Sequence, residues 1–196
     1  IDRPMLEMLL NAGTTRISVN PQTFNDETLR RIGRAHTAQE TIAAYHLARE
    51  AGFTDINMDL IAALPGETLE DFRRTLETTV SLAPESVTVH ALAIKRSSRL
   101  HEQMHVQGGG HGLTPASEAE QMTALARRTL DAGGWKPYYL YRQKYMAGNL
   151  ENVGYARPGM ACLYNIGNME ETASVLALGA GAITKWLFDR ARRIER

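Results

Sequence analysis

The chain has 196 residues, of which 43% are hydrophobic and 22% are charged, and 22 basic side chains balance 22 acidic ones. This composition is typical of a folded globular chain and excludes collagen-like, low-complexity and intrinsically disordered classes. The zero net charge gives no basic surface for nucleic acid, and no apolar run approaches the ~18 residues that a membrane span requires.

Predicted helices and strands alternate along the first half of the chain. An amphipathic helix is expected at the start and stops at Gly13. Capping residues then predict three helices, which begin after Asn25, at the Thr37–Glu40 capping box and at the Thr68–Asp71 capping signal. The predicted strands are 16–20, 56–61 and 87–93. Strands separated by helices predict parallel βα units and an α/β fold.

Each of these strands alternates polar and apolar side chains, so one face of the sheet is expected to be polar. The polar positions are Ser18, Asn20, Asn57, Asp59, Thr88 and His90. In a parallel sheet the crossover helices must cover the apolar face. We therefore favour a polar barrel lumen that receives a ligand, and the alternative is a sheet face that is simply solvated.

The second half begins after a glycine-rich segment. Residues 107–116 predict a flexible connection between a first part, 1–106, and a C-terminal part, 117–196. In the C-terminal part, Ser117 and Glu120 predict a helix to about residue 132, and an aromatic run predicts a strand over 135–141. Shorter strands follow, and a basic helix is expected from about Thr184.

A short motif before the connection matches a zinc site. Residues 101–111 contain His-Glu-x-x-His extended to a third histidine. His101, His105 and His111 could hold zinc while Glu102 acts as general base on the metal-bound water. However, the helix that would carry this motif stops at three glycines. A zinc peptidase is therefore the less favoured alternative to a surface turn.

Other segments resemble a known family over most of the chain. The resemblance spans about residues 5–186 and rests on segments 13–25, 31–36, 56–67, 87–100 and 138–155. These segments resemble radical S-adenosylmethionine enzymes related to oxygen-independent coproporphyrinogen III oxidase, also called coproporphyrinogen dehydrogenase. Heme chaperones of the same family share the earlier segments.

The resemblance implies a set of residues that bind S-adenosylmethionine. Gln22 and Asp59 match family positions that contact the ribose, and Arg34 matches the arginine that holds the methionyl carboxylate. Ala93 matches a position whose backbone meets the adenine, and Ile183 matches a position near a second ligand site.

The resemblance also implies a 4Fe–4S cluster bound by three cysteines, which this sequence does not contain. Its single cysteine, Cys162, cannot hold such a cluster. One cysteine also excludes an intramolecular disulfide and predicts a reducing, cytoplasmic compartment. We therefore expect a fragment: the second half of a partial (β/α)6 radical SAM barrel followed by a small α+β C-terminal region, and inactive alone.

The function implied for the intact enzyme is oxidative decarboxylation of coproporphyrinogen III to protoporphyrinogen IX in heme biosynthesis, with an unidentified electron donor. A heme chaperone is the alternative. The substrate is an apolar macrocycle edged by carboxylates, so its site needs cations beside apolar or aromatic walls. Lys95, Arg96, Arg142 and Lys144 supply the cations beside tyrosines 138, 139 and 141. An edge strand with solvated cations is the other interpretation of these residues.

Overall fold

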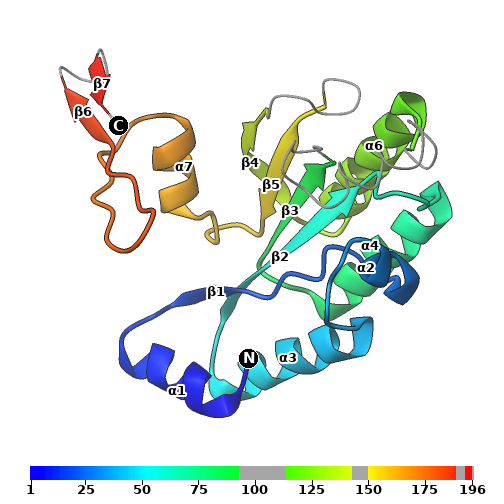
Figure 1. Cartoon of the computed structure of the whole chain (residues 1–196), viewed down its shortest axis with the longest axis horizontal. Coiled ribbons are helices and arrows are strands. Elements are labelled where there is room, and N and C mark those ends of the chain that lie inside the picture. The colour runs from blue at the N-terminus through cyan, green and yellow to red at the C-terminus, as the bar shows by residue number, and fades with distance from the viewer. Residues whose placement is uncertain (93–113, 143–149, 189–192, 196) are drawn as a thin grey trace.

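The computed structural model describes residues 1–92, 114–142, 150–188 and 193–195. Figure 1 shows the elements along the chain. The helices are α1 (Arg3–Asn11), α2 (Asp26–Arg31), α3 (Ala38–Ala51), α4 (Leu69–Leu82), α6 (Ala116–Ala132) and α7 (Leu163–Met169). The strands are β1 (Arg16–Ser18), β2 (Asp55–Ala62), β3 (Ser86–Ala91), β4 (Lys136–Tyr141), β5 (Asn152–Ala156), β6 (Trp186–Phe188) and β7 (Arg193–Glu195).

Five strands form the main sheet in the order β1-β2-β3-β5-β4. The first three are parallel, as expected for βα units. β5 pairs antiparallel with β3, and β4 pairs antiparallel with β5, so the C-terminal part of the chain extends the sheet built by the first part. The short strands β6 and β7 pair separately as an antiparallel ladder.

The predicted capping signals of the first half are confirmed. The Thr37 side chain accepts from the Glu40 amide while the Glu40 carboxylate accepts from the Thr37 amide, and the same reciprocal pair joins Thr68 and Asp71. These bonds satisfy amides that the first turn of a helix leaves free. At the other end, α3 closes on Gly52, whose φ of 114° suits a residue without a Cβ.

Two predictions for the second half are wrong. α6 begins one residue earlier than its expected cap, after Pro115, and no side chain caps it. The basic terminal helix is absent from the described residues, because 186–188 and 193–195 are strands. Lys185 exchanges two backbone hydrogen bonds with Val175, which extends the chain just before the Trp-Leu-Phe run, and aromatic residues favour strands.

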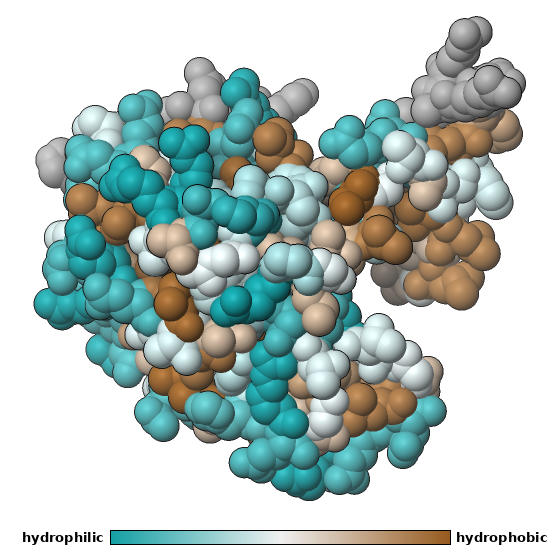
Figure 2. All heavy atoms as spheres, turned by 180° about the vertical axis from the view of Figure 1, so that it is seen from behind, coloured by the Kyte–Doolittle hydropathy of each residue, from teal (hydrophilic) through white to brown (hydrophobic). Residues whose placement is uncertain are grey.

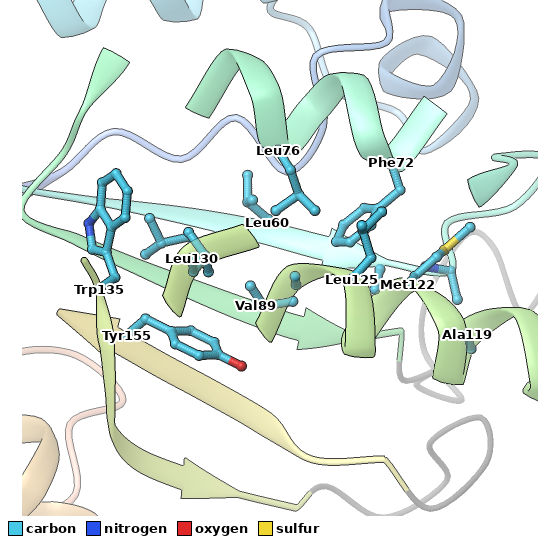
Figure 3. Packing of buried hydrophobic residues seen from close by; sticks show 14 residues of the cluster. Leu60, Phe72, Leu76, Val89, Ala119, Met122, Leu125, Leu130, Trp135 and Tyr155 are labelled. Carbon is cyan, nitrogen blue, oxygen red and sulfur yellow. The ribbon is translucent and has the colours of Figure 1, made fainter. Parts of the chain in front are cut away.

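Helices α1, α3, α4 and α6 cover the apolar face of the sheet, which holds two packed clusters. The smaller cluster joins α1 and α3 to β1 and β2. The larger one joins α4 and α6 to β2, β3 and β5, and Figure 3 shows its side chains. Trp135 lies at one end of that cluster, where its indole N–H donates to the Pro84 carbonyl at 2.8 Å and the Arg157 guanidinium lies over its ring.

The segment after β5 extends away from the helices as an arm that carries α7, β6 and β7 (Figure 1). Apolar side chains gather on this arm as brown patches in Figure 2. The most exposed aliphatic side chains of the arm are Leu163, Leu176, Leu178 and Ile183. Within the described ranges, no helix is long and apolar enough to cross a lipid bilayer.

Candidate functional site

The face of the sheet opposite the helices is polar, as the alternation predicted. The residues that we call the polar face are Arg16 and Ser18 on β1, Asn57 and Asp59 on β2, Ser86, Thr88 and His90 on β3, and Tyr139 and Tyr141 on β4. Successive strand residues alternate between the two faces, so the apolar residues between these positions pack under the helices.

Asn57 is the centre of the hydrogen-bond network on the polar face. Its amide nitrogen donates to the Ser18 hydroxyl at 3.3 Å and to Asp59 Oδ1 at 2.7 Å. Its amide oxygen accepts from the hydroxyls of Ser86, at 3.1 Å, and Thr88, at 3.3 Å. These four bonds use both donors and both lone pairs of the amide. Asn57 therefore has one orientation, and it fixes the position of Asp59.

The Asp59 carboxylate is held through one of its two oxygens. Oδ1 accepts from Asn57 and lies 3.8 Å from His90 Nε2, whereas no described residue donates to Oδ2. Burial is the largest influence on the pKa of Asp59 and raises it, but the contacts with His90, Asn57 and Thr88 together outweigh burial and lower the pKa below its usual value. Asp59 is therefore an ionised acceptor whose Oδ2 is open among the described residues, and a quarter of its side chain is exposed.

Tyrosines from β4 complete the far side of the polar face. The Tyr139 hydroxyl lies 3.3 Å from the Thr88 hydroxyl, and the Tyr141 hydroxyl lies 3.2 Å from His90 Nδ1. The two phenol rings are stacked with an interplanar angle of 3°. Burial raises the pKa of Tyr139 to about 12, so its phenol stays neutral at physiological pH. These rings form an aromatic wall beside Asp59 and His90.

Gln22 lies beside Asp59 at the end of the first strand. Ser18 pairs with Asn57, but the next bridge joins Gln22 to Leu60, so the first strand contains one extra residue. The backbone amide of Gln22 donates to the Asp59 backbone carbonyl, and the backbone carbonyl of Gln22 accepts from the Ile61 amide. Its φ of 66° is unusual for a residue other than glycine. The chain therefore bulges at Gln22 and turns sharply away from β2.

The other predicted ligand contacts are more exposed. Arg34 lies in the turn after α2, and its guanidinium makes no ion pair with a described residue. Ile183 lies on the arm and is 68% exposed. Arg142 pairs with Glu151 at 3.0 Å on the surface. The structure thus brings Gln22 and Asp59 together, and described contacts do not join Arg34, Ile183 or Arg142 to them.

Several predicted residues lie outside the described ranges, namely Ala93, Lys95, Arg96, Lys144 and the histidine motif at 101–111. Their assignments therefore stay predictions. In the part of the chain that the structure describes, no three His, Cys, Asp or Glu side chains gather into a group that could hold a metal ion.

The residues present differ in how well they fit the two implied cofactors. S-adenosylmethionine is a hydrogen-bond donor through its ribose hydroxyls, and Asp59 Oδ2, to which no described residue donates, is an acceptor of the kind that they require. A 4Fe–4S cluster requires cysteine thiolates, and Cys162 is the single cysteine of the chain. This chain can therefore contribute to a nucleoside site, and its own side chains do not fit the cluster.

Comparison with known proteins identifies the family of the chain. The profile of the Radical SAM superfamily matches residues 1–79, which carry β1, β2 and both ribose candidates. The oxygen-independent coproporphyrinogen-III oxidase-like protein HemZ of Bacillus subtilis (strain 168) is 45% identical over 187 residues, which cover 95% of this chain. The chain belongs to the radical SAM superfamily. Members of this superfamily are generally enzymes that use S-adenosylmethionine and a 4Fe–4S cluster.

Other relatives in the superfamily carry a different description. The heme chaperone HemW of Bacillus subtilis (strain 168) is 29% identical over 177 residues, or 90% of this chain. The chain spans 36% of the HemZ relative and 43% of this HemW relative. It therefore corresponds to less than half of either protein.

A solved structure supports the fold. Coproporphyrinogen III oxidase (HemN) from Escherichia coli, described as a radical SAM enzyme, matches 94% of this chain and 42% of its own with a TM-score of 0.70. At 23% sequence identity this likeness is evidence for the fold. The sheet and its covering helices are thus an α/β structure of the radical SAM type, as the resemblance predicted.

Two residues that hold the site in place, Asn57 and Glu67, were not assigned a role from the sequence. The central role of Asn57 was not predicted, although its place on the polar face was. Glu67 was treated as part of a matching segment without a role, yet it is almost completely buried. A charged residue after Pro-Gly is normally exposed, so no sequence signal distinguishes this glutamate from a surface one.

Proposed function

We propose that this chain supplies the ribose and methionyl contacts for S-adenosylmethionine in a protein that oxidatively decarboxylates coproporphyrinogen III to protoporphyrinogen IX. The observation that carries the proposal is the ionised Asp59, which Asn57 fixes and whose backbone carbonyl accepts from the backbone amide of Gln22, while no described residue donates to its Oδ2. The 45% identity to the HemZ relative supports the substrate class.

Each residue of the proposed site has a separate task. Asp59 Oδ2 accepts from the ribose hydroxyls, and the side-chain amide of Gln22 gives the ribose a second polar contact. Arg34 binds the methionyl carboxylate, which a planar guanidinium can hold with two parallel hydrogen bonds. The predicted backbone contact of Ala93 would receive the adenine. Bound S-adenosylmethionine would supply the one-electron chemistry that this oxidation requires.

Asp59→Asn tests the ribose contact. An amide cannot supply the charged acceptor, so S-adenosylmethionine should bind about 10- to 100-fold more weakly, which corresponds to about 1.5–3 kcal/mol for a hydrogen bond to a charged group. Isothermal titration calorimetry measures the change. Asp55→Asn is the control, because Asp55 lies on the same strand and face but pairs with Arg16. Equal affinities of the Asp59→Asn variant and wild type would exclude Asp59 from the site.

Arg142 is proposed to bind a propionate of the macrocycle. Its exposed ion pair with Glu151 contributes only about 0–1 kcal/mol, so the guanidinium can exchange that partner for a substrate carboxylate. Arg142→Ala should weaken binding of coproporphyrin III, a fluorescent analogue of the substrate, about 10- to 100-fold. Glu151→Gln is the control and should bind at least as tightly as wild type, because it frees the arginine. An unchanged affinity of Arg142→Ala would remove Arg142 from the substrate site.

A heme chaperone is the second candidate function, and the HemW relatives favour it. The same titration separates the two. Tight binding of heme by the chain, without binding of coproporphyrin III, would favour the chaperone. Binding of coproporphyrin III that depends on Arg142 favours the decarboxylase.

A further inference from the structure

Glu67 is a buried carboxyl group for which the proposed site has no use. It follows the Pro65–Gly66 turn after β2, and its side chain is only 3% exposed. One carboxyl oxygen, Oε1, accepts from the Thr23 hydroxyl at 2.5 Å. The other, Oε2, is buried without a hydrogen-bond partner among the described residues. A buried glutamate with half of its acceptors unused requires an explanation.

The partner of Glu67 belongs to the turn that carries Gln22. Thr23 directly follows Gln22 and is fully buried. Its hydroxyl also accepts from the Asn25 amide at 3.1 Å and lies 3.2 Å from the Thr75 hydroxyl on α4. The Thr75 hydroxyl in turn accepts from the Phe24 amide at 3.2 Å. Glu67 and Thr75 therefore anchor the turn 22–25 from behind, and this turn holds Gln22 in its left-handed conformation beside Asp59.

The charges around Glu67 do not compensate its burial. Arg31, on α2, is the nearby cation, but its guanidinium donates to the Pro65 carbonyl and pairs with Glu27. On α4 the nearby charged group is Asp71, which opposes a second negative charge. Burial is the largest influence on the pKa of Glu67 and raises it above its ordinary value of 4.5, although the hydroxyls of Thr23 and Thr28 lower it in part.

We propose that Glu67 is a positioning residue for Gln22: in its protonated form it fixes the turn 22–25 beside Asp59, and loss of its proton releases the turn. The effect on ligand binding rests on the proposed function, since it requires Gln22 to contact the ribose. An ionised carboxylate would be left almost completely buried with only the hydroxyls of Thr23 and Thr28 beside it, and the pocket can relieve this cost only by opening to water. The turn 22–25 lies outside the helices and strands, so it is the part of the pocket that can move most readily.

The direction of the pH dependence follows from linkage. The proton is bound more tightly in the folded chain than in the unfolded chain. The stabilisation that it gives is therefore complete below pH 4.5 and is lost as the pH rises through the folded pKa. As the pH rises from below 4.5 through the folded pKa, the affinity for S-adenosylmethionine should fall about three- to tenfold, the loss of one neutral hydrogen bond from Gln22.

Glu67→Gln is the decisive variant, because the amide has the shape of the protonated acid and does not titrate. The affinity of Glu67→Gln for S-adenosylmethionine, measured at the same pH values, corrects for titration of the ligand itself. The wild-type affinity should fall relative to that of Glu67→Gln as the pH rises. Thr23→Val removes the donor and should bind weakly at every pH. Glu27→Gln, at an exposed glutamate of α2, is the matched control and should behave as wild type.

A second measurement does not depend on the ligand. The carboxyl carbon of Glu67 is followed by NMR as the pH changes, together with hydrogen exchange of the Phe24 and Asn25 amides corrected for intrinsic rates. Protection of both amides should fall as Glu67 ionises, and it should stay constant in Glu67→Gln. Titration of Glu67 at its ordinary pKa, or the same loss of affinity in wild type and Glu67→Gln, would overturn the proposal. If protection of the two amides depended on pH but the chain did not bind S-adenosylmethionine, the proposed function would be contradicted and the positioning role of Glu67 would remain.

Discussion

Replacing Trp135 by alanine should lower the free energy of unfolding by about 3–5 kcal/mol, the range for buried aromatic side chains. The indole is 1% exposed and packs against the larger core cluster between the sheet and α6. Its removal also leaves the Pro84 carbonyl without its donor and removes the ring under the Arg157 guanidinium. Domains are typically stable by only about 5–15 kcal/mol, so a large share of the stability depends on this one side chain.

The second tryptophan of the chain is the matched control. Trp186 is 49% exposed on the arm, and Trp186→Ala should change stability by no more than about 0.5 kcal/mol. Urea unfolding followed by circular dichroism compares the two variants without relying on tryptophan fluorescence. If both variants lost the same small amount, Trp135 would not be the core anchor that its burial indicates.

Adding a methyl group at Gly154 should destabilise the sheet by about 1–3 kcal/mol, the usual cost of overpacking. Gly154 lies opposite Tyr139 across β4 and β5, and the Tyr139 ring occupies the space that a Cβ would need. The backbone of Gly154 does not have a positive φ. Glycine is therefore required here for space, and Gly154→Ala should drive the phenol away from Thr88 and out of the aromatic wall.

A double-mutant cycle tests this packing directly. Tyr139→Ala removes the ring, so Gly154→Ala should cost almost nothing in the Tyr139→Ala background, and the coupling should be about 1–3 kcal/mol. Ultraviolet titration gives a second readout, because burial holds the pKa of Tyr139 at about 12. In Gly154→Ala that phenol should titrate closer to its ordinary value of 10.0. Additive stability effects with an unchanged titration would contradict the predicted clash.

The sequence predicted those parts of the fold and site that depend on local pattern. The polar face follows from period-two alternation, and the capping boxes of α3 and α4 follow from residues three apart. Asp59 and Gln22 were proposed because they match family positions at strand ends, and the structure brings their backbones together. In each case the signal lies within a few residues of the feature that it predicts.

What the sequence did not predict depends on contacts between distant segments. The Tyr139–Gly154 packing requires the register of β4 against β5, and the burial of Glu67 requires α2, α4 and the turn 22–25 to close around it. The wrong terminal helix has another cause, because short apolar runs beside basic residues are ambiguous between helix and strand. There, pairing with residues near Val175 decided the outcome.

The order of strands in the sheet also has a consequence for how the chain folds. Trp135 donates to the Pro84 carbonyl across 51 residues of sequence, and β3 pairs with β5 rather than with the next strand along the chain. Such contacts require closure of a long loop before they return any free energy, which slows folding. The pairings within the parallel β1–β2–β3 layer are closer in sequence than the pairing of β3 with β5, since Arg16 pairs with Asp55 and Asn57 with Ser86, whereas Ser86 pairs with Ala156. We therefore expect this layer to form first and to serve as the template on which β5, β4 and Trp135 assemble in a later, rate-limiting step.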